Sequence, residues 1–371
     1  MKADFMSHFS TVPDPRIDRC KRHELMDILF LSISAVLCGA EGWEEIEDFG
    51  RARLDWLRRY FPYTNGIPKH DTIARVLSRL EPKALQESFI GWVNAACQLS
   101  EGEVVAIDGK TVRRSFQTGD RKSAIHMVSA WASQNALVLG QQKVDSKSNE
   151  ITAIPELLEL LELKGCIVTI DAMGTQREIA KAIRAKGADY VLALKGNQGT
   201  LEEDVKLLFS LPLSVSMTEQ VRAEEVESGH GRIESRTYRQ VALGRAGLPS
   251  SKGWEDLSSV IEVIATRDNG TTQSTERRYY ISSLPLDVET AARAVRRHWG
   301  VENSLHWVLD VTFREDESRI RRGNGAEVMS VLRRLTLNLL KQNTTSAASM
   351  KRKRKIAAMD DALRTEIMAG N

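Results

Sequence analysis

Cysteine is scarce in this chain, apolar runs are short and the net charge is close to zero. The four cysteines lie far apart and form no CxxC pair, which argues against a zinc knuckle or a disulfide framework and is typical of a reducing cytoplasm. The longest apolar stretch, residues 25–40, is too short for a bilayer span and carries a charge at Asp27. The first residues lack the pattern of a signal peptide. We therefore expect a cytoplasmic protein that is not bound to a membrane.

The 52 lysines and arginines nearly balance the 50 acids, which leaves a net charge of +2. This average does not indicate a nucleic-acid partner, but binding to phosphate depends on local clusters of basic charge. A solvated helix face would give such clusters too, so each one alone is weak support for DNA binding. The clusters lie at residues 16–22, 51–59, 319–322 and 351–355.

A chain of 371 residues is too long for one small domain, so we expect two or three units that share a central core. The first 100 residues carry apolar side chains at helical spacing and predict an N-terminal helical, DNA-binding domain. His70-Asp71-Thr72 resembles the entry to a helix-turn-helix recognition helix, although an ordinary capped helix is the favoured reading. The expected helices are 22–37, 43–60, 69–80 and 82–99.

The pattern changes at residue 103, where a second unit begins. Three short strand-like segments, a helix, a strand, a helix and a further strand follow, which is the order of the ribonuclease-H-like fold. We expect residues 101–212 to form the first part of an α/β catalytic domain of this kind. Its strands are expected at 104–107, 125–132, 136–144, 166–170 and 190–194, and its helices at 151–163 and 175–186.

Residues 213–285 alternate between apolar and polar side chains and predict a β-rich insertion. After it, residues 286–342 return to helical spacing and are expected to complete the catalytic domain. Residues 343–371 are polar and basic, and predict a flexible tail that either contacts DNA or only keeps the chain in solution. The insertion's strands are expected at 218–227, 232–241, 258–266 and 275–283, and the later helices at 288–308 and 326–341.

Two aspartates stand at the ends of apolar strands, Asp108 before Gly109 and Asp171 before Ala172. Reactive groups of α/β folds gather at the carboxyl ends of strands, so neighbouring strands would place both carboxylates in one space. Either aspartate alone is more often a turn residue, but two in this strand order favour catalysis. Oxygen ligands of this kind suit Mg²⁺ or Mn²⁺, and a pair of such ions suits phosphodiester chemistry.

Glu302 is the best candidate for a third acid. On a helix it shares one face with His298, His306 and Asp310, which recur at intervals of four residues. A zinc-type cluster is the competing interpretation, but it would leave the two strand-end aspartates unexplained. Two weaker rivals, Glu315 and Glu327, lie in segments dense with charge.

Three motifs together resemble those of bacterial insertion-sequence transposases of the H-repeat-associated (ISAs-type) group. They are the runs at residues 106–115, 169–176 and 298–311. The similarity extends over nearly the whole chain, including Asp14-Pro15-Arg16 and the run at 229–234. It implies a ribonuclease-H-like catalytic domain interrupted by a β insertion before the third acid. It also implies Mg²⁺ as cofactor and metal-binding roles for Asp108, Asp171 and Glu302.

The sequence departs from related transposases around the third acid. In relatives a Tyr, an Arg and a Lys often accompany this Glu, and their places are taken here by Val295, His298 and Leu309. The phosphate-contacting roles of those neighbours therefore do not carry over. Arg296 or Arg297 is the candidate to replace them as a phosphate contact.

Basic residues near the acids and in the insertion are candidate DNA contacts. A basic triplet beyond the first acid suits phosphate, and a lysine ends a strand at the same edge. Alternate charged residues in the insertion would form either a ladder facing DNA or a self-satisfied ion-pair network. The tryptophans, Trp254, Trp299 and Trp307, are expected mainly in the core. The candidate contacts are Lys110, Arg113, Arg114, Lys195, His230, Arg232, Arg236 and His298.

From these observations we expect a DDE-type DNA transposase that cuts DNA at transposon ends and joins the freed 3′-hydroxyl to target DNA. Two Mg²⁺ or Mn²⁺ ions would serve as cofactors, double-stranded terminal-repeat and target DNA as partners, and a homodimer would form on DNA. The protein would work in the bacterial cytoplasm at the nucleoid. The alternatives are another ribonuclease-H-like nuclease, such as a resolvase, and a catalytically silent DNA-binding descendant of a transposase.

Overall fold

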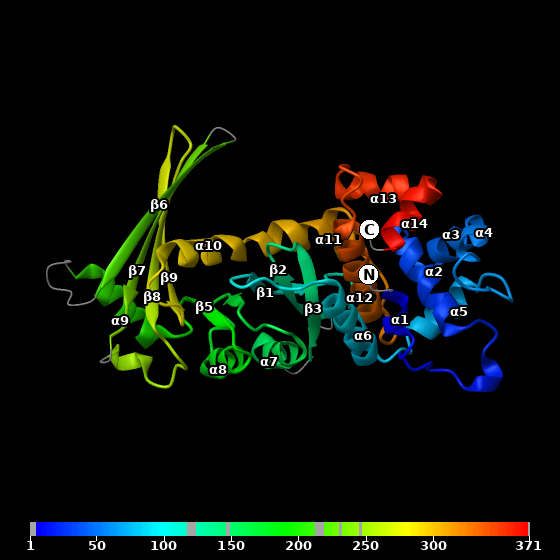
Figure 1. Cartoon of the computed structure of the whole chain (residues 1–371), viewed down its shortest axis with the longest axis horizontal. Helices are drawn as coiled ribbons and strands as arrows, with labels where there is room; N and C mark the ends of the chain where they lie inside the picture. Colours follow the sequence, from blue (N-terminus) through cyan, green and yellow to red (C-terminus); the bar gives the residue numbers. More distant parts are fainter. Residues whose placement is uncertain are drawn as a thin grey trace.

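A nine-stranded sheet, in the order β3-β2-β1-β4-β5-β9-β8-β7-β6, runs through the molecule. The computed structural model describes residues 5–116, 124–145, 149–211, 219–229, 232–244 and 247–369. Figure 1 shows the sheet continuing from the centre of the molecule into the tall strands at its left end. The strands are β1 (Val104–Thr111), β2 (His126–Ala132), β3 (Leu137–Val144), β4 (Ile167–Ile170), β5 (Asp189–Leu194), β6 (Gln220–Gly229), β7 (Arg232–Ala242), β8 (Ser259–Asp268) and β9 (Gln273–Ser282).

The first five strands have the predicted ribonuclease-H-like arrangement. β1 is antiparallel to β2 and parallel to β4, and β4 is parallel to β5. The helices α7 (Glu150–Leu160) and α8 (Arg177–Ala185) lie below this sheet and α10 (Val288–His298) lies above it (Figure 1). β4 is buried along its whole length, and so is the first half of β1. Because helices cover both faces of the sheet, the sequences of both strands are continuous apolar runs.

The insertion extends this same sheet. β9 pairs with β5 in antiparallel register, from Val191↔Ser282 to Leu194↔Tyr279, and β8, β7 and β6 follow as antiparallel neighbours. The expected strands match the observed ones closely because alternation is a strong signal in half-buried antiparallel strands. The first expected strand begins outside the described residues. The short helices α9 (Gly199–Ser210) and η3 (Pro249–Ser251) flank the insertion.

The N-terminal helices pack on the opposite end of the sheet through α12 (Gly325–Gln342), which is buried along most of its length. α12 contacts α2, α6 and β3, so the helical unit and the catalytic sheet share one apolar core. None of the helices in the described ranges has the length and apolar character needed to cross a bilayer. The N-terminal elements are α1 (Phe5–Phe9), η1 (Asp18–Cys20), α2 (Leu25–Leu37), α3 (Trp43–Ala52), α4 (Leu54–Leu57), α5 (His70–Leu77) and α6 (Pro82–Ala96).

The helix that begins with His70 has no cap from its own N-cap residue, Lys69, and is held instead by an acid of another helix. Glu47 of α3 accepts a hydrogen bond from the backbone N–H of His70 at 2.7 Å and contacts its ring Nδ1 at 2.8 Å. Residues 58–69 separate α4 from α5, whereas a helix-turn-helix motif has a turn of about three or four residues. The motif resemblance therefore does not extend to the geometry of the connection.

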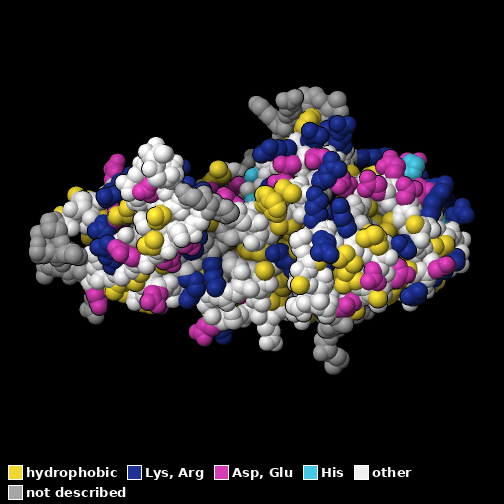
Figure 2. All heavy atoms as spheres, turned by 90° about the horizontal axis from the view of Figure 1, so that it is seen from above, with side chains coloured by type: hydrophobic (Ala, Val, Ile, Leu, Met, Phe, Trp, Pro, Cys, Tyr) yellow, Lys and Arg dark blue, Asp and Glu magenta, His cyan; other side chains and the backbone are white. Residues whose placement is uncertain are grey.

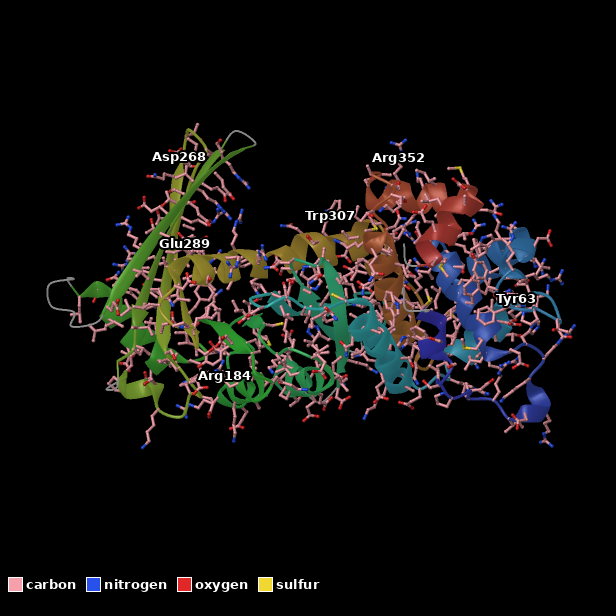
Figure 3. The ribbon with its side chains drawn as sticks, in the orientation of Figure 1. Tyr63, Arg184, Asp268, Glu289, Trp307 and Arg352 are labelled. Carbon is pink, nitrogen blue, oxygen red and sulfur yellow. The ribbon has the colours of Figure 1, made fainter. Side chains whose placement is uncertain are left out.

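The C-terminal segment, expected as a flexible tail, forms two packed helices instead. These are α13 (Met350–Met359) and α14 (Asp361–Met368). Lys353 donates to the carbonyls of Leu340 and Asn343 at 3.0 and 2.7 Å, and Arg354 donates to the carbonyl of Val36 at 2.7 Å. These carbonyls stand at the ends of other helices, where no partner within the helix is available. Part of the basic run thus joins helices together; Figure 3 shows Arg352, in contrast, at the outer surface of α13.

Candidate active site

Asp108 and Asp171 lie side by side at the carboxyl ends of two neighbouring strands, β1 and β4. β1 and β4 run parallel with Ile107 opposite Ile170, and the two aspartates are the next residues along each strand. One oxygen of Asp108 accepts the N–H of Gly109 at 2.9 Å. One oxygen of Asp171 accepts the backbone N–H groups of Met173 and Gly174 at 3.0 and 3.2 Å. Backbone amides therefore fix one oxygen of each carboxylate.

Glu302 lies on a π-helical turn, η4 (Glu302–His306), between α10 and α11 (Trp307–Val311). The backbone N–H of Trp307 donates to the carbonyl of Glu302, five residues earlier. Such turns are rare and occur often at functional sites. In Figure 1 the whole segment forms one long helix above the sheet, joining the insertion to the helical end of the molecule. The Glu302 side chain is exposed at this turn.

The polar stripe on this helix faces the sheet, as its spacing predicts. The Nδ1 atom of His298 lies 3.0 Å from the hydroxyl of Thr169 on β4. The Nδ1 atom of His306 lies 3.5 Å from Asp108 Oδ2. In a regular α-helix a residue four places on is rotated ~40° past a full turn, so the stripe would wind away from the sheet. The wider π turn offsets this rotation.

Burial and neighbouring acids raise the pKa of both aspartates. Burial raises the pKa of Asp108 to about 7, and the negative charges of Asp171, Glu150 and Glu302 add to the rise. Burial also raises the pKa of Asp171, with a further contribution from Glu150. Four carboxyl groups therefore act on one small region. Asp108 and Asp171 are thus neighbours, and the charge of the exposed Glu302 acts on Asp108.

Glu150 is a member of this cluster that sequence reasoning did not find. It is the first residue of α7, directly after the N-cap Asn149, where acids are common for helix-dipole reasons alone. Its Oε1 lies 2.6 Å from Nε2 of His126. A Cβ on Gly109 would stand 2.1 Å from Glu150 Oε1 and 2.6 Å from His126 Nε2. Glycine at 109 is therefore required for Glu150 to approach the strand.

Both histidines of the stripe are neutral near pH 7. Burial lowers the pKa of His298 to about 4. Burial, followed by the nearby charges of Arg334 and Lys110, lowers the pKa of His306 to about 4. His298 had been expected to contact DNA. In the structure its ring contacts Thr169 of β4, so its contact with DNA stays a prediction.

Lys110, also expected to contact DNA, is buried in an ion-pair network. Its Nζ lies 2.7 Å from Asp310 and 2.9 Å from Asp316, and 3.6 Å from the fully buried Glu315. The side chain is only 8% exposed, and its contact with DNA stays a prediction. Its position inside β1 explains this burial, since alternation turns it to the same face as Asp108. The network joins β1 to α11 and to η5 (Glu315–Glu317).

The two rivals for the third acid have structural partners. Burial opposes ionisation of Glu315, but Arg334, Arg333 and Lys110 outweigh it and lower its pKa to about 2. Arg334 donates to Glu315 at 3.0 Å. Glu327 lies 3.3 Å from Lys143. Neither acid adds to the pKa rise of Asp108, in contrast to Glu302.

The donor chemistry of the cluster fits a hard divalent cation. Carboxylate oxygens are the ligands that Mg²⁺ and Mn²⁺ prefer, and a cation is what such an accumulation of like charge requires. Within the described residues, no three His, Cys, Asp or Glu side chains stand close enough together to form a closed ligand set.

The remaining basic candidates fall into two groups. Lys195 is exposed just after β5, in a loop whose Asn197 donates to the carbonyl of Ala172 beside Asp171. In the insertion, Arg236 bonds to Glu227 at 3.0 Å and pairs with Glu234. Arg232 also pairs with Glu234, at 2.9 Å. These contacts match the ion-pair-network interpretation of the insertion. The remaining candidate there, His230, lies outside the described residues.

A cavity of about 960 Å³ opens between the insertion and the catalytic helix. Its lining includes Trp299, Glu302 and Arg278, with other charged residues of β6 to β9. Trp299 is 37% exposed, and the Arg278 guanidinium lies 4.7 Å from its ring centre. Trp254 is buried as expected, whereas Trp307 is 58% exposed on the long helix, where Figure 3 labels it. Glu302, the candidate third acid, thus borders this cavity.

Comparison with known proteins gives consistent matches over the whole chain. Residues 99–339 match the family described as "Transposase DDE domain", and residues 6–93 match the family described as "DDE_Tnp_1-associated". "Putative transposase YncI" of Escherichia coli O157:H7 is 45% identical over 98% of this chain and 94% of its own length. "H repeat-associated putative transposase YhhI" of Escherichia coli K12 is 43% identical over 99% and 98%.

Proposed function

The chain belongs to the DDE transposase family, and from this premise we propose that Asp108, Asp171 and Glu302 carry its chemistry. As a transposase it cuts strands at transposon ends and transfers them to target DNA. The observation that supports the residue assignment best is the parallel pairing of β1 and β4, which makes Asp108 and Asp171 neighbours at the ends of these strands. The charge of Glu302 also helps to raise the pKa of Asp108.

The three acids would hold Mg²⁺ or Mn²⁺, we propose as a pair of ions. When bound, such ions activate an attacking oxygen and stabilise a leaving one in phosphodiester chemistry. The backbone amides at Gly109, Met173 and Gly174 leave the second oxygen of each aspartate for this role. The exposed Glu302 has room to approach when the negative charge is neutralised.

The surrounding residues position these groups. Neutral His306 supports Asp108 from the helix side, and Lys110 holds β1 to the same helix through Asp310. The reaction would then be hydrolysis at the donor strand, followed by attack of the freed 3′-hydroxyl on target DNA. Among the described side chains, no Ser/His or Cys/His pair suggests a covalent enzyme intermediate.

The DNA would approach across the open side of the cluster, where Glu302, Lys195 and the large cavity are exposed. Basic charge is concentrated in places on the surface even though the net charge is small; Figure 2 shows Lys and Arg side chains gathered near the middle of one face, beside a hydrophobic patch. We propose double-stranded terminal-repeat and target DNA as the partners, with two copies of the chain acting together. The N-terminal helices remain a predicted DNA-binding unit.

Cleavage of a labelled duplex carrying the end of the protein's own element tests the assignment. Asp108→Asn, Asp171→Asn and Glu302→Gln each remove a charged ligand while nearly preserving shape, so cleavage in Mg²⁺ should fall to background. DNA binding should persist or tighten, because one negative charge near phosphate is lost. Glu156→Gln, on the same helix as Glu150 but bonded to Gln142, is the control and should cut normally. A catalytic variant that cuts as fast as the wild type would refute the assignment.

A further inference from the structure

Two arginine pairs that lie about 200 residues apart in sequence meet in one small pocket. The pocket has a volume of about 390 Å³ and is lined by Arg113, Arg114, Phe116, Arg319 and Arg321. We call it the arginine pocket. The first pair follows the end of β1, and the second lies between η5 and α12. Its lining therefore carries four guanidinium groups and no acid, a composition that attracts an anion.

Internal contacts hold one side of the arginine pocket in place. The guanidinium of Arg321 lies 4.7 Å from the ring centre of Phe116, and its Nε donates to the carbonyl of Arg114 at 2.9 Å. Arg113 is paired with Asp316 at 3.2 Å. These contacts connect the segment after β1 to the segment before α12, so the pocket is a built feature of the fold.

On the other side of the pocket, two arginines have no acidic partner among the described residues. Arg114 and Arg319 are exposed, and in the described part of the chain no acid comes within ion-pair distance of either. The acid whose pKa Arg114 helps to lower, Glu317, is already paired with Arg314. Two unpaired guanidinium groups at the mouth of a pocket are suited to bidentate binding of phosphate oxygens.

The pocket is tied to the catalytic strand. Asp316 bonds both to Lys110 of β1 and to Arg113 of the pocket. Arg114 is six residues beyond Asp108, which places it at most ~20 Å away even along a fully extended chain. A DNA strand advances about 3.4 Å for each nucleotide along the duplex axis. The pocket is therefore within roughly six nucleotides of a phosphate positioned at Asp108.

We propose that the arginine pocket binds the phosphodiester backbone of the transposon end, within about six nucleotides of the bond that is cut. This inference rests on the proposed function, since it takes Asp108 as the cutting site. The pocket contributes no sequence reading, because guanidinium groups bind every phosphate alike. It fixes the register of the duplex over the acids, which is the usual role of phosphate contacts.

The test compares binding of the full-length wild type and an Arg114→Ala/Arg319→Ala variant to a fluorescein-labelled duplex of the element end. Duplexes with one neutral methylphosphonate at successive positions show which phosphates are needed. In the wild type, neutral substitution should weaken binding most at one or two positions within about six nucleotides of the cut. In the variant that penalty should vanish, and the slope of log affinity against log salt should fall by about two, one for each lost contact.

Arg322→Ala is the matched control, because Arg322 is exposed beside Arg321 but does not line the pocket. It should leave the methylphosphonate pattern unchanged. Cleavage at saturating DNA separates the inference from the proposed function: the double variant should still cut in Mg²⁺ but at positions less strictly confined to the element end, whereas Asp108→Asn should not cut but should keep the methylphosphonate pattern. The inference is overturned if the double variant keeps both the wild-type salt slope and the position-dependent penalty. Proper folding of each variant is checked by its circular dichroism spectrum.

Discussion

Asp108→Asn should stabilise the metal-free protein at pH 8, although it abolishes cleavage. Burial and the charges of Asp171, Glu150 and Glu302 raise the pKa of Asp108 from 3.8 to about 7. The folded protein therefore holds a proton between about pH 4 and pH 7 that the unfolded chain has released. Its stability falls as the pH rises through this window, because ionised Asp108 is disfavoured only in the folded state.

The size of the effect follows from the pKa. A rise from 3.8 to about 7 corresponds to about 4 kcal/mol as an upper bound, since one tenfold change in an equilibrium is 1.36 kcal/mol. The side chain is 21% exposed, so solvent screening reduces this figure, and we expect a gain of ~1–3 kcal/mol for the variant. Asparagine preserves the shape and the bond from Gly109 while removing the charge.

Thermal unfolding followed by circular dichroism in EDTA measures the change. Asp108→Asn should melt higher than the wild type at pH 8, and the difference should shrink at pH 5, where Asp108 of the folded wild type is protonated. Mg²⁺ should raise the melting temperature of the wild type more than that of the variant, because bound ligand stabilises the folded state. Asp71→Asn, with a side chain that is 90% exposed, should change neither. A variant that is destabilised at pH 8, or stabilised equally at both pH values, would refute this reasoning.

Two further substitutions test the structural roles of charged residues. Arg354→Ala should lower the free energy of unfolding by ~2–4 kcal/mol in urea titration, because it removes charge-assisted bonds to the carbonyls of Thr312 and Val36. Arg352→Ala, at an exposed position of the same helix, should leave the free energy of unfolding unchanged. Equal effects of the two substitutions would contradict the packed arrangement of α13. Glu315→Gln should cost ~3–5 kcal/mol in the same titration, because it leaves buried Arg334 without its anionic partner. An unchanged unfolding midpoint for Glu315→Gln would contradict the network.

Strand order and the two aspartates were predictable because both signals are local. An apolar run that ends in an acid is visible in sequence, and so is the alternation of the insertion's strands. The sequence also predicts that the helix with Glu302 presents a polar stripe. Glu150 was not predictable, because an acid after an N-cap has an ordinary explanation, and its proximity to Asp108 arises from the packing of α7 against β2 and β3.

Charge alone does not tell which basic side chains are exposed. Lys110 and His298 were both expected from the sequence to contact DNA. Position along a strand or helix decides which way a side chain points, and both residues point inward. The same holds for Arg354 in the basic run at the C-terminus, whereas Lys351 on that helix is exposed. Basic clusters in a sequence therefore predict a DNA-binding surface only when the residues that are buried in the fold are left out of the cluster.

The π turn explains how one helix can contact β1 and still leave Glu302 exposed. His306 and Asp310 must face β1, since they contact Asp108 and Lys110. Glu302, four residues before His306, must remain exposed beside the cavity where DNA would enter. In a regular α-helix with Glu302 in the same place, each later residue of the stripe would be rotated a further ~40° about the helix axis, away from the sheet. The extra residue in the turn lets the contacts to β1 and the open position of Glu302 coexist on a single continuous element.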